Sequence, residues 1–134
     1  MAPEAAREEL ARRVNAIEGG YELMLAYAAQ GLPSDQGASS SGQLREHLAR
    51  FAEALTGLGD VYRDLAVSLA VGPTDALDAF LEVLARDAAA ARASIRLVLG
   101  RPGISSQLVD NLNASIHIRA LLTDVFVIDE LLKG

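Results

Sequence analysis

Apolar side chains recur at steps of three and four residues along most of this chain, the spacing that places them on one face of a helix. Four segments carry the pattern, at about residues 3–30, 43–70, 75–99 and 105–133. In the second segment the spacing is that of a coiled-coil seam, formed by Leu44, Leu48, Phe51, Leu55, Leu58, Tyr62, Leu65 and Leu69. We therefore expect one all-α domain that spans residues 1–134.

The segment 105–133 differs from the others because its apolar residues fall on more than one helical face. They are Ile116, Ile118, Leu121, Leu122, Val125, Phe126, Val127, Ile128 and Leu131. Asp124, Asp129 and Glu130 interrupt it, whereas a membrane span needs about 20 nearly uncharged residues. We expect this helix to lie at the centre of a bundle or to be shared with a second copy, which would make the protein a homodimer.

Residues that favour helix starts separate the four segments. Ser40, followed three residues later by Gln43, predicts a capping box at the start of the second helix. Gly72 or Thr74 would cap the third helix, and Ser105 the fourth. These signals support four separate helices rather than one long coiled coil.

The connections between the helices indicate how the helices are arranged. The stretch 31–42, rich in Gly and Ser, predicts a mobile loop that is long for a helical bundle. The connections near residues 71–74 and 100–104 are short, and short connections place successive helices side by side and antiparallel. The sequence therefore predicts an antiparallel up-down-up-down four-helix bundle.

Composition excludes several classes of partner. The net charge of −6 and the absence of a Lys/Arg cluster argue against binding to nucleic acid and to anionic membranes. Without cysteine the chain forms neither a disulfide framework nor a thiolate metal site. The first residues lack the basic and apolar regions of a secretion signal, so we expect a cytoplasmic protein.

Small residues gather at one level of the predicted bundle. Matching helix ends across each connection places Glu18, Leu55, Ala89 and Ser115 at similar heights, within about 2–4 residues. The small residues near this level are Gly19, Gly20, Gly57, Gly59, Ala88, Ala89, Ala90, Ala91, Ala114 and Ser115. Either the helices approach closely here or a cavity opens; we favour close packing.

Polar residues lie near the same level. They are Glu18, Tyr21 and Glu22 of the first helix, Asp87 of the third, and His117 and Arg119 of the fourth. One interpretation is a structural ion pair between Asp87 and Arg119, with the two glutamates at the surface. The other is a polar ligand pocket in the middle of the bundle, lined by all six residues.

The known metal and nucleophile chemistries of helical bundles fit poorly. A di-iron site needs two Glu-x-x-His motifs, but Glu46 and His47 are adjacent and Ala114 lies three residues before His117. Two histidines without cysteine also make a zinc site or a cysteine nucleophile a poor expectation. The apolar residues around His47 favour a core-edge position over a phosphotransfer role, and His117, between Ile116 and Ile118, offers no better case for that role.

One stretch resembles a motif of the helical nucleotide pyrophosphohydrolases, all-α enzymes that bind magnesium through an acidic pair and a Glu-x-x-Asp motif. The resemblance covers residues 58–62, with Asp60 as the matching acid and Glu18 and Glu22 as the earlier pair. It implies magnesium-dependent hydrolysis of a nucleotide. Gly57 occupies the position of the second Glu, and Glu18 and Glu22 are four residues apart rather than three.

We therefore expect a non-catalytic cytoplasmic bundle that acts as an interaction or regulatory module and holds a small ligand at mid-bundle. Its partners would be a second copy of the chain and either another protein or a small polar ligand. The alternative is the magnesium-dependent pyrophosphohydrolase-like enzyme. The sequence names no cofactor.

Overall fold

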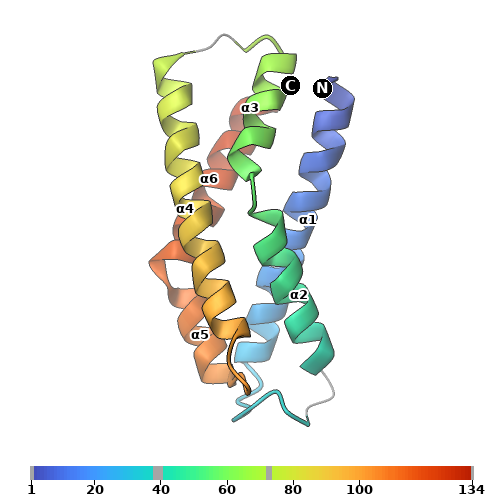
Figure 1. The fold of residues 1–134 in the computed structure, drawn as a ribbon, viewed down its shortest axis with the longest axis vertical. Coiled ribbons are helices and arrows are strands. Elements are labelled where there is room, and N and C mark those ends of the chain that lie inside the picture. Colours follow the sequence, from blue (N-terminus) through green and yellow to red (C-terminus); the bar gives the residue numbers. More distant parts are fainter. Residues whose placement is uncertain (1, 38–40, 72–73, 134) are drawn as a thin grey trace.

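The computed structural model describes residues 2–37, 41–71 and 74–133, without the side chain of Ser41. In these ranges the chain is all-helical, with six helices and no strand. The helices are α1 (Pro3–Ala28), α2 (Ser41–Ala54), α3 (Leu58–Ser68), α4 (Asp75–Leu99), α5 (Ser106–Ala114) and α6 (Ile116–Leu132). They form an elongated molecule whose long axis the helices follow, with both termini at the same end (Figure 1).

The structure corrects the expected number of helices from four to six. The segment 43–70 divides into α2 and α3, and the segment 105–133 into α5 and α6. Gly57 causes the first break because its φ of +70° is left-handed, a conformation that suits glycine and cannot continue an α-helix. Ser115 marks the second break with an extended ψ of 145° and caps α6 through its side chain.

The break between α2 and α3 is stabilised from α1. The guanidinium of Arg13 donates hydrogen bonds to the backbone oxygens of Ala54, at 3.1 Å, and of Thr56. In a continuous helix, these oxygens would accept hydrogen bonds from backbone N–H groups one turn later. Arg13 supplies the donors that are missing because the helix is interrupted. Glu9 holds Arg13 in place through an ion pair of 2.8 Å.

The hydrophobic core follows the predicted apolar pattern across both breaks. The predicted seam of the second segment is buried from Leu44 to Leu65, while Leu69 is half-buried at its end. Most of the apolar positions of α6 are also buried, with a second set exposed: Ile116, Phe126, Val127 and Leu131. The prediction that this helix is apolar on more than one face is confirmed.

Two of the three predicted N-terminal caps, those of α4 and α5, lie within the described residues. The side chain of Thr74 accepts a hydrogen bond from the backbone N–H of Leu77 at 2.9 Å, and that of Ser105 accepts from Leu108 at 3.0 Å. Both caps are confirmed. Ser40 lies outside the described residues.

The first half of the predicted loop 31–42 is bound to the helices. Asp35 is only 1% exposed, and its carboxylate accepts a hydrogen bond from the backbone N–H of Ile104 at 2.8 Å. It also pairs with Arg45 at 2.7 Å, and Arg45 donates to the carbonyl of Leu99. Asp35 thus joins this loop to the start of α2 and to the connection that follows α4. The loop's mobility stays a prediction for residues beyond this anchor.

None of the helices in the described ranges has the length and the apolar character that crossing a membrane requires.

Candidate ligand pocket between α3 and α4

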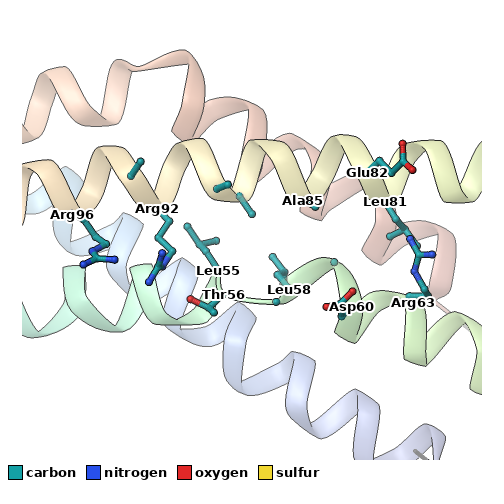
Figure 2. A pocket seen from close by; sticks show the side chains of 15 residues that line it. Leu55, Thr56, Leu58, Asp60, Arg63, Leu81, Glu82, Ala85, Arg92 and Arg96 are labelled. Atoms are coloured by element: carbon teal, nitrogen blue, oxygen red, sulfur yellow. The ribbon is translucent and has the colours of Figure 1, made fainter.

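A pocket of about 600 Å³ lies where the break between α2 and α3 faces α4. We call it the α3–α4 pocket. Figure 2 shows its side chains, contributed by α4 on one side and by the connection 55–57 and α3 on the other. The lining consists of Leu55, Thr56, Gly57, Leu58, Gly59, Asp60, Arg63, Leu81, Glu82, Ala85, Ala88, Ala89, Arg92, Ala93 and Arg96.

The break and the small side chains of α4 together create this space. At the break, residues 55–57 leave the helical path, and Gly57 and Gly59 present no side chain to α4. Opposite them α4 presents Ala85, Ala88 and Ala89, which reach only a short way across the gap. Leu55 and Ala89, predicted to share a level, both line the pocket.

Small residues pack closely elsewhere at the same level. A Cβ atom added to Gly20 of α1 would lie 2.7 Å from a ring carbon of Phe51, so α1 and α2 touch at this glycine. A Cβ added to Gly59 would find its nearest neighbour, the Leu81 carbonyl oxygen, at 3.5 Å, an ordinary contact. The level of small residues therefore contains a close packing of α1 on α2 and an open space between α3 and α4.

Two arginines dominate one end of the α3–α4 pocket. Arg92 and Arg96 are one turn apart on α4, and their side chains extend from α4 toward α2 (Figure 2). The Nε atom of Arg92 is buried and has no hydrogen-bond partner. A buried donor without an acceptor is uncommon and costs folding free energy, so it calls for an explanation.

The other end of the pocket has mixed charge. Arg63 of α3 forms an ion pair with Asp78 at 3.4 Å, and both side chains are largely exposed. Asp60, in the first turn of α3, and Glu82 of α4 add negative charge there. The pocket is thus positive near Arg92 and Arg96 and acidic near the start of α3, with an apolar surface between.

The six residues predicted from sequence lie outside this pocket. Glu18 and Glu22 are exposed on α1, His117 and Arg119 are exposed on α6, and Tyr21 and Asp87 are half-buried. The three residues of α1 lie close together because they share one helix, as do the two residues of α6. Their role in binding a ligand stays a prediction.

Asp87 faces an acid that the sequence interpretation missed. Asp124 of α6 is only 9% exposed. Its pKa is raised to about 7, mainly by burial and then by a hydrogen bond with Asp87 and by the negative charge of Asp87. One carboxyl oxygen of Asp124 is buried without a donor. Because two carboxylates only accept hydrogen bonds, a bond between these acids requires a proton on one of them. Arg119 is exposed, and the predicted Asp87–Arg119 ion pair is absent from those found among the described residues.

The residues that carry the pocket's charge were also missed by sequence reasoning. Arg92 and Arg96 follow an acidic start of the same helix, an ordering that by itself suits the helix dipole. The signal that could have identified them is their spacing of four residues, which places two like charges on one face and beside the run of alanines at 88–91.

The described part of the chain offers no metal centre. It contains no group of three or more His, Asp and Glu side chains placed to hold a metal ion. Asp60 lines the pocket, but Glu18 and Glu22, its expected partners in a magnesium site, are exposed on α1. No protein-family model, curated protein or solved structure was found to match this chain.

Proposed function

We propose that this protein is a non-catalytic helical-bundle protein that binds a small molecule in the α3–α4 pocket and acts as a regulatory or interaction module. The observation that carries the proposal is a pocket of about 600 Å³ lined by Arg92, a residue whose buried Nε has no acceptor. Pockets for small molecules have about this volume and combine an apolar surface with a few polar groups.

The lining of the pocket supports binding rather than catalysis. It includes no His, Cys or Ser, so the usual nucleophiles and the commonest general base are missing from its walls. Leu55, Leu58 and Leu81 supply apolar surface, and the charged side chains stand at the two ends. This arrangement suits the orientation of a ligand with one anionic end and an apolar body.

The proposal includes the larger architecture expected from the sequence. We propose that α2 and α3 act as one bent rod and α5 and α6 as another, so that with α1 and α4 they form an antiparallel four-rod bundle. We also propose a homodimer through the exposed apolar side chains of α6. The helical periodicity places Ile116, Val127 and Leu131 on one face of that helix, within about a quarter-turn of one another. All three side chains are exposed.

Protein-observed NMR tests the binding proposal. A library of neutral and charged fragments should shift the amide signals of residues 55–60 and 85–92 in a saturable manner. Ala89→Leu, which fills the pocket, should abolish those shifts, and Ala79→Leu, at an exposed position of α4 outside the lining, should preserve them. A library that leaves these amides unmoved, or shifts that persist in Ala89→Leu, would contradict the proposal.

Calorimetry with Mg²⁺ separates this proposal from the pyrophosphohydrolase alternative. A saturable heat of binding that Asp60→Asn removes would favour the magnesium-dependent enzyme. A nucleoside-triphosphate panel would then measure hydrolysis. We expect neither binding nor hydrolysis.

A further inference from the structure

We propose that the ligand of the α3–α4 pocket is a small organic phosphate monoester, with its phosphoryl group between Arg92 and Arg96 and its organic part along the alanines of α4. This inference rests on the proposed function, since it names the class of molecule that the same pocket takes. Four observations support it: two unpaired arginines, a buried donor, the charge gradient along the pocket and its apolar middle.

The first observation is that Arg92 and Arg96 have no carboxylate partner. Acids outnumber bases in this chain, 18 to 12, and the ion pairs among the described residues engage other arginines: Arg12, Arg13, Arg45, Arg50 and Arg63. Arg92 and Arg96 take part in none of these pairs. Two like charges one turn apart on a helix repel each other, and an anion between them turns that repulsion into attraction.

The second observation is the unsatisfied donor of Arg92. Arg92 lines the pocket, and its Nε is buried and has no acceptor. A guanidinium offers five N–H donors in a planar fork and accepts nothing, so only an acceptor satisfies it. An oxyanion bound beside Arg92 provides that acceptor.

The third observation fixes the direction of the ligand. Asp60 and Glu82 stand at the opposite end from Arg92 and Arg96, where the third arginine of the lining, Arg63, is paired with Asp78. The two carboxylates repel a second anionic group and accept hydrogen bonds from a hydroxyl or an amine. The positive end of the α3 helix dipole also lies there, but Asp60 in the first turn already neutralises part of it. The anionic group of a ligand therefore belongs at the arginine end.

The fourth observation distinguishes a phosphate monoester from a carboxylate. Two guanidinium groups together carry two positive charges and fork-like donors that match several oxygens at once. A phosphate monoester carries a charge of about −1.5 to −2 at neutral pH and three acceptor oxygens, whereas a carboxylate has one charge and two oxygens. The surface of Leu58, Ala85 and Ala89 accommodates a compact apolar body attached to the phosphoryl group.

NMR of the arginine Nε–H groups of the full-length protein tests this inference directly. The probes are phenyl phosphate, inorganic phosphate and, as the uncharged counterpart, benzyl alcohol. We expect phenyl phosphate to shift the Nε–H signal of Arg92 and to bind at least tenfold more tightly than benzyl alcohol. Affinity should fall as the pH drops below about 6, where the phosphoryl group takes up a proton.

Three variants identify the site. Arg92→Gln and, separately, Arg96→Gln should each weaken phenyl phosphate binding at least tenfold. Arg86→Gln, at an exposed position of the same helix outside the lining, should change it less than twofold. Because Arg96 is exposed, Arg96→Gln keeps the test valid even if Arg92→Gln disturbs folding.

The outcomes separate this inference from the proposed function. Neutral fragments that bind in the pocket while phenyl phosphate does not would overturn the phosphate assignment and leave the binding function standing. Pocket amides that respond to no fragment and no phosphate would overturn both. Equal weakening by Arg86→Gln would indicate attraction by overall charge and would also overturn the assignment.

Discussion

Asp124 of α6 lies against Asp87 of α4, two acids at an interface where the sequence predicted an acid facing a base. Burial and the neighbouring Asp87 raise the pKa of Asp124 to about 7. The folded protein therefore holds this proton more tightly than the unfolded chain, in which an Asp has a pKa of about 3.9. The stabilisation is complete at acidic pH and is lost as the pH rises through about 7.

We therefore expect the free energy of unfolding to decrease between about pH 4 and pH 7 on account of this pair. Asp124→Asn removes the titrating group and should raise stability at pH 8 by about 1–3 kcal/mol, while flattening the pH dependence. Burial also raises the pKa of Asp129, although a hydrogen bond from Tyr62 opposes this shift. Asp129 therefore acts in the same direction as Asp124, and Asp124→Asn will flatten the pH dependence only in part. Urea denaturation at several pH values provides the measurement.

The control for this prediction is Asp110→Asn, an exposed position on α5. It should leave the shape of the pH profile unchanged. A profile that Asp124→Asn and Asp110→Asn alter alike would show that Asp124 is not the group responsible.

The adjacent glycines of α1 should respond to alanine in opposite directions. At Gly20 a Cβ would lie 2.7 Å and 2.9 Å from atoms of the Phe51 side chain, too close to be accommodated without a shift of α1 against α2. We expect Gly20→Ala to cost about 1–3 kcal/mol. At Gly19 the nearest atom is a ring carbon of His47 at 3.8 Å, so Gly19→Ala should stabilise the helix by about 0.5–1 kcal/mol.

Chemical denaturation of the two variants side by side checks this prediction. Each is the other's control, because both replace a glycine in the same turn of the same helix. Similar effects of the two substitutions would mean that α1 does not contact α2 at Gly20.

The buried carboxylate of Asp35 should be the most sensitive position in the connection between α1 and α2. Asp35→Ala removes the acceptor of the Ile104 N–H and the carboxylate paired with Arg45, which keeps its bonds to backbone carbonyls, and should cost about 1–3 kcal/mol. Glu46→Ala, which removes an exposed i,i+4 pair with Arg50, should cost less than about 1 kcal/mol. Thermal unfolding compares the two, and equal small losses would show that Asp35 is not an anchor.

The helical segments and the core were predictable because both depend on periodicity. A three-and-four spacing survives a change of helix direction, so the seam from Leu44 to Leu65 is buried although the helix breaks within it. The breaks were not predicted because Gly57 and Ser115 are tolerated in a continuous helix at a modest cost. What decides between a kinked and a broken helix is tertiary, such as the donors that Arg13 supplies to the backbone oxygens of residues 54 and 56.

The level of the pocket was predictable, but its lining was not. Register arguments placed Leu55 opposite Ala89, and an error of one turn does not move them from this level. A register error of one or two residues rotates a helix by about 100–200°. Such an error decides whether Asp87 or Arg92 faces a given neighbour, and it leaves open which residue of α6 faces Asp87. Charged side chains could therefore be assigned to a level but not to a partner.

The exposed apolar face of α6 leads to the last prediction, that the protein self-associates through it. Val127 and Ile118 are nine residues apart and therefore lie on opposite sides of this helix. Val127 is 51% exposed, whereas Ile118 is fully buried, so only Val127 is available to a second copy. Val127→Glu should convert dimers to monomers at micromolar concentration, as measured by sedimentation, because burying a charge in an apolar interface is costly. The thermal stability should change little, because the same charge at the surface of a monomer stays in water. Val67→Glu, at an even more exposed valine of α3, should leave the association unchanged. Ile118→Glu, at a fully buried position, should unfold the chain rather than dissociate the dimer. A wild-type protein that sediments only as a monomer would rule out this interface.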